Sequence, residues 1–283
     1  MTDRRLTPAN DRVADQALRD SVAAPRYVAG VRQRVIAPLA DLLAAPGGAR
    51  DRQLLMGDGF RVLETRNGFA FGQALRDGYV GYVREDRLGP DKPATHIVTA
   101  PATHLYTAPD VKAPEHAALS FGARLTVSGH SGAFARIDAG GFVPKAHLTD
   151  AATGCRFTDP VAVAEMFLGT PYLWGGNSRA GLDCSALIQI ACLACGIACP
   201  GDSDLQCAQL GQPLPADART QRGDIVFWHG HVGWMSDGRT LLHANAHHMS
   251  VTREPLQDAC ARIEAQGGGA PIAFKRIPPD RSG

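Results

Sequence analysis

Short apolar segments separated by turn residues dominate the first half of the chain. Across residues 28–88, runs of Val, Leu, Phe and Tyr alternate with Gly, Asp and Asn. Residues 61–72 predict two strands joined at Asn67-Gly68, because an Asn-Gly pair favours the positive backbone angles of a two-residue hairpin. Residues 1–27 are polar and largely aperiodic, and we interpret them as an N-terminal tail or a clamp laid over the surface.

This strand layout occurs twice along the chain. The segments 121–127, 132–137, 140–143 and Leu148 repeat the layout of 58–63, 68–71, 78–83 and Leu88. Short strands at regular spacing predict small barrels. Pro90-Asp91-Lys92-Pro93 marks the boundary between the repeats. We therefore predict one all-β domain over residues 28–92 and a second over residues 93–152.

From residue 153 the pattern changes to helices and then back to strands. Residues 160–168 predict a short helix that ends at Gly169. A second helix, apolar on all sides and therefore buried, is predicted to open at Asp183 or Cys184 and to stop at Gly196. Strands are predicted at 224–228, 232–235, 240–244, 249–253 and 272–276, with a hairpin turn at Asp237-Gly238. Helices before an antiparallel sheet predict an α+β domain over residues 153–283.

Composition excludes several classes of function. The 283-residue chain carries 29 Lys and Arg against 28 Asp and Glu, a net charge of +1, which favours no nucleic acid and no anionic membrane as partner. No apolar run approaches the roughly 18 residues that a membrane-spanning helix needs. The polar start, residues 1–7, lacks the apolar segment of an export signal, so we expect a cytoplasmic protein. The pattern predicts no particular oligomeric state.

The seven cysteines do not predict a disulfide framework, because their number is odd and the start is not that of an exported protein. Cys192, Cys195 and Cys199 have a spacing that could bind a metal or an iron–sulfur cluster. Two of them lie on the predicted apolar helix, and a structural zinc site usually needs four well-spaced ligands. We interpret these cysteines as small buried apolar residues and expect no metal and no organic cofactor.

One cysteine lies where a loop becomes a helix. Cys184 follows Gly181-Leu182-Asp183 and precedes Ser185. Backbone N–H groups and the positive end of the helix dipole are expected to lower the pKa of its thiol, and the thiolate is the nucleophile. His231 and His243 lie twelve residues apart on strands expected to pair. We predict that Cys184 attacks a carbonyl carbon, that His231 is the base, and that His243 fixes the tautomer of that base.

Other assignments compete at these positions. His229 lies two residues before the predicted base, would point the same way on a strand, and is an alternative base. His243 and His247 are spaced like zinc ligands, but the His-Glu-x-x-His pattern of zinc peptidases is absent. Asp183 is placed to cap the helix and could also bind a substrate ammonium. A buried structural thiol is the alternative for Cys184.

These motifs resemble those of the NlpC-type cell-wall cysteine peptidases, a papain-like family. The matching segments are Tyr172-Leu173-Trp174-Gly175-Gly176, Gly181-Leu182-Asp183-Cys184-Ser185, Arg222-Gly223-Asp224-Ile225-Val226-Phe227, His231-Val232-Gly233 and Leu242-His243-Ala244. They cover roughly residues 154–276, and the two upstream barrels resemble the bacterial SH3-like domains that accompany this family. The resemblance implies two small all-β SH3-like barrels followed by an α+β papain-like cysteine peptidase domain.

The resemblance also implies an activity and a substrate. The branch of the family with two SH3-like domains hydrolyses the γ-D-glutamyl–diamino acid bond of peptidoglycan stem peptides that have a free N-terminal L-alanine. The residues that would bind the alanine ammonium and shape its pocket are Tyr172, Trp174, Asp183, Ser185 and Ser203. The first barrel would close the pocket with Asp58 and Tyr79, for which Tyr82 is the alternative. The expected role is murein peptide recycling, with the stem peptide as partner.

Three positions depart from the family pattern. Ala186 stands where Gly is usual, Gly201 stands where Arg is frequent, and Asp58 stands where Glu is common. The Gly201 change alters local support of the loop that carries Ser203, and the shorter side chain of Asp58 alters its reach. Two other functions are compatible with the sequence: a wall-binding module with a silent peptidase domain, and an amidase or acyl-transfer enzyme on the same fold. The preferred diamino acid, and whether the barrels bind glycan, are left open.

Overall fold

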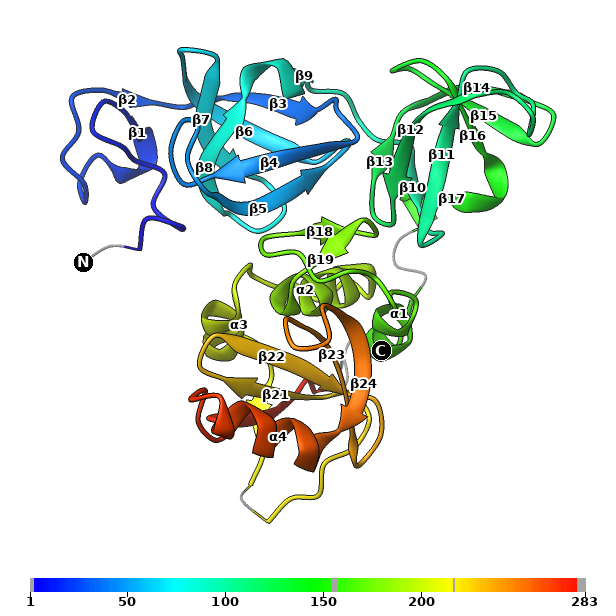
Figure 1. Cartoon of the computed structure of the whole chain (residues 1–283). Coiled ribbons are helices and arrows are strands. Elements are labelled where there is room, and N and C mark those ends of the chain that lie inside the picture. Colours follow the sequence, from blue (N-terminus) through cyan, green and yellow to red (C-terminus); the bar gives the residue numbers. More distant parts are fainter. Residues whose placement is uncertain (1–2, 154–156, 216, 279–283) are drawn as a thin grey trace. The chain divides into compact units, whose positions relative to one another are not determined.

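The computed structural model describes residues 3–153, 157–215 and 217–278 and divides the chain into two compact units (Figure 1). The first unit comprises residues 1–154 and the second residues 155–283. Gly154 and Cys155, at the start of the predicted last domain (residues 153–283), lie outside the described residues. Among the helices of the described ranges, none has the length and apolar character needed to cross a membrane.

The first barrel of the first unit is built from one seven-stranded sheet. Its strands, in spatial order, are β5 (Arg50–Leu55), β4 (Leu39–Leu43), β8 (Val80–Arg84), β7 (Phe69–Ala74), β6 (Gly59–Arg66), β3 (Val31–Val35) and β9 (Leu88–Pro90). The predicted hairpin is confirmed, because Arg66 pairs with Phe69 around a turn in which Asn67 and Gly68 both have positive φ. The ladder of paired strands places alternate side chains on the inner face of the sheet.

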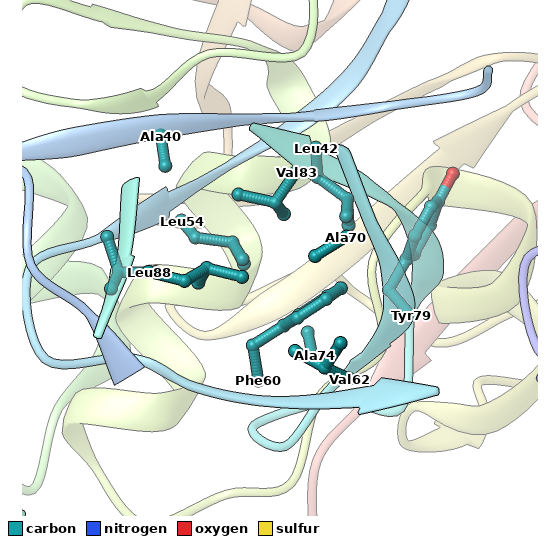
Figure 2. Close-up of a cluster of buried hydrophobic side chains, with 11 residues drawn as sticks. Ala40, Leu42, Leu54, Phe60, Val62, Ala70, Ala74, Tyr79, Val83 and Leu88 are labelled. Carbon is teal, nitrogen blue, oxygen red and sulfur yellow. The ribbon is translucent and has the colours of Figure 1, made fainter. Parts of the chain in front are cut away.

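A compact apolar cluster fills this barrel (Figure 2). Phe60 and Leu42 are fully enclosed in it, and Leu54 is nearly so. Tyr79 lies at its margin, with the ring among the aliphatic side chains and the hydroxyl pointing away from them (Figure 2). The turn between β5 and β6 and the chain entering β8 are thereby fixed to a rigid core.

The second barrel resembles the first but has eight strands in two sheets, of three and five strands. It comprises β10 (His96–Val98), β11 (Ala102–Tyr106), β12 (Glu115–Ser120), β13 (Arg124–Leu125), β14 (Val127–Ser131), β15 (Phe134–Ile137), β16 (Phe142–Pro144) and β17 (Leu148–Asp150). The predicted repeat is confirmed down to its last turn, where a short 3₁₀ helix precedes each final strand. Leu88 and Leu148 end these helices with nearly equal φ/ψ pairs of −112°/149° and −115°/149°.

The N-terminal segment packs on the first barrel. It forms β1 (Ala14–Asp15) and β2 (Tyr27–Val28), joined by a 3₁₀ helix at Gln16–Leu18. Val13 is fully buried against Leu63, Phe71 and Val80 of the barrel. Within the same unit, Arg34 of β3 donates to Asp138 of the second barrel at 2.6 Å, so an ion pair joins the two barrels.

The second unit is α+β. Its helices are α1 (Pro160–Glu165), α2 (Cys184–Ala194), α3 (Ser203–Gln209) and α4 (Leu256–Ala265). Two-residue strands β18 (Asn177–Ser178) and β19 (Gly181–Leu182) form a hairpin just before α2. The main sheet has the order β20 (Gln212–Pro213), β25 (Ala273–Arg276), β21 (Asp224–Trp228), β22 (His231–Met235), β23 (Thr240–Asn245) and β24 (Ser250–Pro255).

The predicted elements are present with shifted ends, and two helices were not predicted. α1 ends at Glu165 rather than Leu168, although Gly169 has positive φ as expected at the stop. α2 begins and ends as predicted, with Asp183 as its N-cap and Gly196 just past its end. α3 is short and largely polar, whereas α4 was missed although Leu256, Ala259, Cys260 and Ile263 have the i, i+3, i+4, i+7 spacing of an amphipathic helix. α4 nevertheless covers one face of the sheet, where Ala259 packs against Trp228 and Leu241.

Candidate active site

Asp183 anchors the start of the cysteine helix. Its Oδ1 accepts hydrogen bonds from the Ala186 N–H at 2.7 Å and the Ser185 hydroxyl at 3.0 Å, and its Oδ2 accepts from the Gly175 N–H at 3.0 Å. The side chain thus caps α2 and also ties the preceding aromatic loop to it. Loss of such a cap costs about 0.5–2 kcal/mol of stability. The position of Cys184, the first residue of α2, is therefore set by three contacts of its neighbour.

The helix start does not lower the pKa of the Cys184 thiol, contrary to our expectation. Burial raises that pKa to about 12, and the negative charge of Asp183 adds to the effect. Backbone N–H groups of Val232, Ser185 and Cys184 itself act in the opposite direction but are outweighed. The thiol is desolvated at the point where the dipole acts, so burial is the larger effect. Cys184 rests as a neutral thiol beside the start of β22.

The structure brings the two predicted histidines together. His231 begins β22, His243 lies in the middle of β23, and their Nε2 and Nδ1 atoms are 2.7 Å apart. Trp228 lies against His231, with ring centroids 5.6 Å apart. Burial lowers the pKa of His231 to about 3, with a smaller contribution from His243. Both rings are therefore neutral around pH 7, since burial also lowers the pKa of His243.

A carboxylate that the sequence did not reveal lies behind His243. Glu254 Oε1 is 2.7 Å from His243 Nε2, and Arg262 of α4 binds the same oxygen. Burial alone would raise the pKa of Glu254, but hydrogen bonds from His243 and Arg262 outweigh it and hold that pKa at about 2. The polar contacts thus run from His231 through His243 to an ionised carboxylate. Glu254 lies one residue beyond the predicted strand 249–253, and only the pairing of β23 with β24 could have placed it.

Gly233 provides the space for His243. It lies on β22 two residues after His231, so the two positions share a face of the sheet. A Cβ atom at this position would lie 3.0 Å from His243 Cβ and 2.9 Å from Leu241 Cδ1. The glycine of the His-Val-Gly segment is therefore required by packing against the neighbouring strand.

We predict that Gly233→Ala misplaces His243 without unfolding the domain. Overpacking of this kind costs about 1–3 kcal/mol, and a displaced orienting residue lowers kcat more than it raises KM. Gly129→Ala is the matched control, because it is also a strand glycine but its Cβ would meet only the end of Arg136 at 3.6 Å. Equal kcat values for Gly233→Ala and the wild type would contradict this role.

Tyr172 lies beside the nucleophile. Its segment runs next to Leu182, since the Leu173 N–H donates to the Leu182 carbonyl at 2.9 Å. Burial raises the pKa of the Tyr172 hydroxyl, and electrostatic interactions with the neighbouring Cys184 and Asp183 raise it further. The structure thus brings Tyr172 and Asp183 together at Cys184. Trp174, in the same loop, is 70% exposed.

The loop before α3 is held by a buried glutamine. Gln206 donates through Nε2 to the carbonyl oxygens of Ser185 at 2.8 Å and Pro200 at 3.1 Å, which ties α3 to the first turn of α2. Ser203 is the first residue of α3, directly after Asp202 with its positive φ of 32°. With Gly201 in place of the expected Arg, Gln206 supplies support for this loop.

Asp58 and Tyr79 belong to the first unit, whereas the other predicted site residues belong to the second. Asp58 Oδ2 accepts from the Leu55 N–H at 2.9 Å and pairs with Arg76 at 3.0 Å. Burial raises the pKa of this carboxyl although Arg76 opposes the shift. Tyr79 contributes its ring to the barrel core, and the ring of the alternative Tyr82 is tilted by 42° against that of Phe71, with centroids 4.9 Å apart.

Two histidines named as alternatives lie in turns. His229 and Gly230 form the two-residue turn between β21 and β22, because Trp228 pairs directly with His231. His229 is therefore exposed and not on a strand, which corrects the expectation that it shares the direction of His231. His247 lies in the exposed turn after β23, with its ring against His248. In the described ranges, no cluster of three or more His, Cys, Asp or Glu could hold a metal ion.

The fold and site have the arrangement of a cysteine peptidase: a cysteine begins a buried helix, and a histidine pair lies on the adjoining sheet. Comparison with known proteins gives the family. Residues 169–262 match the NlpC/P60 family, and residues 42–88 match the bacterial dipeptidyl-peptidase SH3 domain. The resemblance that the motifs predicted is confirmed for these two regions, one similar to the NlpC/P60 family and one to the SH3 domain of bacterial dipeptidyl-peptidases.

Individual relatives are similar to only part of the chain. Dipeptidyl-peptidase 6 of Lysinibacillus sphaericus is 34% identical over 85 residues, which is 30% of this chain and 31% of that protein. Gamma-D-glutamyl-L-lysine dipeptidyl-peptidase of Bacillus subtilis is 35% identical over 94 residues, with the same shares. The chain therefore matches only about a third of the length of each of these two curated relatives.

A solved structure supports the order of domains. An NlpC/P60 family protein from Bacillus cereus superposes with a TM-score of 0.72 at 21% identity, covering 87% of this chain and 99% of that one. The predicted fold class, SH3-like β domains followed by an α+β NlpC/P60 domain, is confirmed.

Proposed function

We propose that the protein is a cysteine endopeptidase that hydrolyses the γ-D-glutamyl–diamino acid bond of peptidoglycan stem peptides with a free N-terminal L-alanine. The observation that carries the proposal is the placement of Cys184 at the start of α2, next to β22, which begins with a histidine bonded to His243 at 2.7 Å. Similarity to gamma-D-glutamyl-L-lysine dipeptidyl-peptidase supports the choice of bond.

The resting charges determine the chemistry. A thiol of pKa about 12 and an imidazole of pKa about 3 coexist as neutral groups, so the proton moves during attack and not before it. As the Sγ–C bond forms, the thiol proton passes to His231. The carbonyl oxygen gains the negative charge, which the N–H of Cys184, free of an intrahelical acceptor at the helix start, can stabilise.

The remaining steps return the enzyme to its starting state. His231 gives its proton to the leaving amine of the diamino acid as the C–N bond breaks, which leaves a thioester on Cys184. Water then attacks the thioester carbonyl and gives a proton to His231. When the S–C bond breaks, the sulfur recovers that proton, and the peptide ending in D-glutamate is released with a free carboxyl group.

The amine-binding side of the proposal rests on Asp183. Its carboxylate is fixed by three hydrogen bonds, so its orientation is set before any substrate arrives. Tyr172 lies close enough for the charge of Asp183 to affect its pKa, and Ser185 donates to the same carboxylate. A fixed anion with nearby hydroxyls is suited to an ammonium group, because a desolvated cation needs a counter-charge and acceptors.

The decisive experiment compares L-Ala-γ-D-Glu-meso-diaminopimelate with the same peptide acetylated at its N-terminus, with products identified by mass spectrometry. We expect cleavage of the free peptide and a loss of at least about 100-fold in kcat/KM on acetylation, because acetylation removes the charge that Asp183 would bind. Equal cleavage of both peptides would keep the peptidase and refute the amine-reading pocket. Cleavage of neither would favour a wall-binding module or another acyl substrate.

A cytoplasmic location is part of the same recycling proposal, in which the substrates are small soluble fragments and not the intact wall. Cell fractionation with an antibody to the untagged protein tests it. Recovery of the protein outside the cytoplasmic membrane would refute this part and leave the reaction untouched.

A further inference from the structure

A line of polar contacts continues behind His243, away from Cys184. Glu254 lies opposite Leu241 in the β23–β24 ladder, so its side chain is on the same face of the sheet as that of His243. Its Oε1 is 2.7 Å from His243 Nε2, and Arg262 of α4 binds the same oxygen. His243 is fully buried, so its ring can satisfy its polar atoms only through these neighbours.

We propose that Glu254 is a positioning residue for catalysis: it accepts the Nε2–H of His243 and thereby fixes the tautomer in which His243 Nδ1 accepts a hydrogen bond from His231. The effect of Glu254 on turnover rests on the proposed function. The tautomer itself is a property of the free protein.

The two histidine tautomers are linked. If His243 carries its proton on Nε2, its Nδ1 has a lone pair and His231 must donate from Nε2 across the 2.7 Å contact. His231 Nδ1 then has a free lone pair, and a neutral imidazole can take the thiol proton there. If His243 instead carries its proton on Nδ1, it donates to His231, whose remaining nitrogen is then protonated. That arrangement has no base for Cys184.

The charge of Glu254 decides between the two tautomers. An ionised carboxylate only accepts, so without a proton on His243 Nε2 two lone pairs would face each other at 2.7 Å. Asn245 offers the competing contact, with Nδ2 3.0 Å from His243 Nε2. The Asn245 Oδ1 accepts the His248 N–H at 2.8 Å, so its amide cannot turn to offer an oxygen instead. The charge-assisted bond to Glu254 is the shorter and the stronger of the two.

The surrounding charges keep Glu254 ionised and His243 neutral. The pKa of Glu254 is held at about 2, against the effect of burial, by its bonds to His243 and Arg262. At His243, burial lowers the pKa and Glu254 raises it, while Arg262 and His248 lower it again. The hydrogen bonds from His243 and Arg262 thus favour the ionised form of Glu254, and burial, with a smaller contribution from Arg262, favours the neutral form of His243.

The first test reads the tautomer directly. Protein labelled with ¹⁵N in histidine is examined by two-bond ¹⁵N–¹H correlation, and the His243 signals are identified by their loss in His243→Asn. We expect the Nε2–H tautomer of His243 in the wild type and a mixed or Nδ1–H state in Glu254→Ala. An Nδ1–H tautomer in the wild type would overturn the proposal, as would an unchanged Nε2–H tautomer in Glu254→Ala.

The second test measures catalysis with the full chain. We expect Glu254→Ala to lower kcat by roughly 10- to 100-fold, the range seen when a residue that orients a functional histidine is removed, with KM nearly unchanged. Glu254→Gln keeps an acceptor oxygen and should recover much of the loss. Glu264→Gln is the matched control, because it makes the same change at an exposed position of α4 and should keep wild-type kcat. A wild-type kcat in Glu254→Ala would refute the catalytic role.

The two tests separate this inference from the proposed function. If the wild type holds His243 as the Nε2–H tautomer, loses it in Glu254→Ala and yet cleaves no stem peptide, the proposed function fails and the positioning stands. If the peptide is cleaved but wild-type His243 is the Nδ1–H tautomer, the proposed function stands and the positioning role of Glu254 fails. Should Glu254→Ala fail to fold, the wild-type spectrum still decides, because an Nδ1–H tautomer of His243 there overturns the proposal.

Discussion

Replacement of Cys184 by alanine is expected to abolish cleavage of the free stem peptide, with a loss on the order of 10⁶-fold in kcat, as for other covalent nucleophiles. No covalent thioester can form without the sulfur. The fold should be retained, since the bonds that shape the start of α2 come from Asp183 and not from the thiol. Mass spectrometry of the products and a thermal melt of the variant check the two parts.

Cys192→Ala is the matched control for this result. Cys192 is fully buried in the same helix two turns further on and lies beside Cys199, so its replacement also removes a buried sulfur from α2. It is expected to lower stability by about 1 kcal/mol while leaving kcat/KM near the wild-type value. Activity of Cys184→Ala within tenfold of the wild type would refute Cys184 as the nucleophile, whatever the control does.

Replacement of His231 by alanine has the second largest expected effect, a loss of about 10⁴- to 10⁶-fold in kcat at pH 7. The reason is the pKa of Cys184. A thiol of pKa about 12 in the protein is ionised to only about 10⁻⁵ at pH 7, so without a base the nucleophile is almost entirely protonated.

The direction in which kcat/KM of His231→Ala changes with pH tests the mechanism. Below its pKa, the thiolate fraction rises tenfold for each pH unit, so the residual kcat/KM of His231→Ala should rise with unit slope between pH 7 and 10. The wild type should be nearly flat over pH 5 to 9, because His231, of pKa about 3, stays neutral and Cys184 stays protonated there. An acid limb near pH 6.5 in the wild type would indicate that His231 titrates freely, contrary to its burial.

His229→Ala completes this experiment. His229 lies in the exposed turn directly before β22, two residues from His231. Its replacement by alanine therefore removes an imidazole that takes no part in the site of Cys184, His231 and His243. The control should keep wild-type kcat and a flat profile. If His229→Ala were the inactive variant and His231→Ala the active one, the base would have been assigned to the wrong histidine.

Much of the fold was predicted from sequence because it rests on local rules. Asn67-Gly68 marked a hairpin because few residues adopt positive φ, and the capping residue Asp183 marked the start of α2. The missed helix α4 shows the limit of such rules. Its apolar residues Leu256, Ala259 and Ile263 recur at helical spacing, but the surface that they cover is set by the docking of α4 on the sheet, a contact between segments far apart in the chain.

For the site, the sequence alone determined the chemical types: a cysteine at a helix start, two histidines on paired strands, and an aspartate that caps the helix. The tertiary structure alone decided their protonation. Burial reversed the expected shift at Cys184, because desolvation depends on the packing around a group and not on its place along the chain. It also decided that Glu254 and Arg262 lie behind His243, since strand register and helix docking bring them together from separate elements.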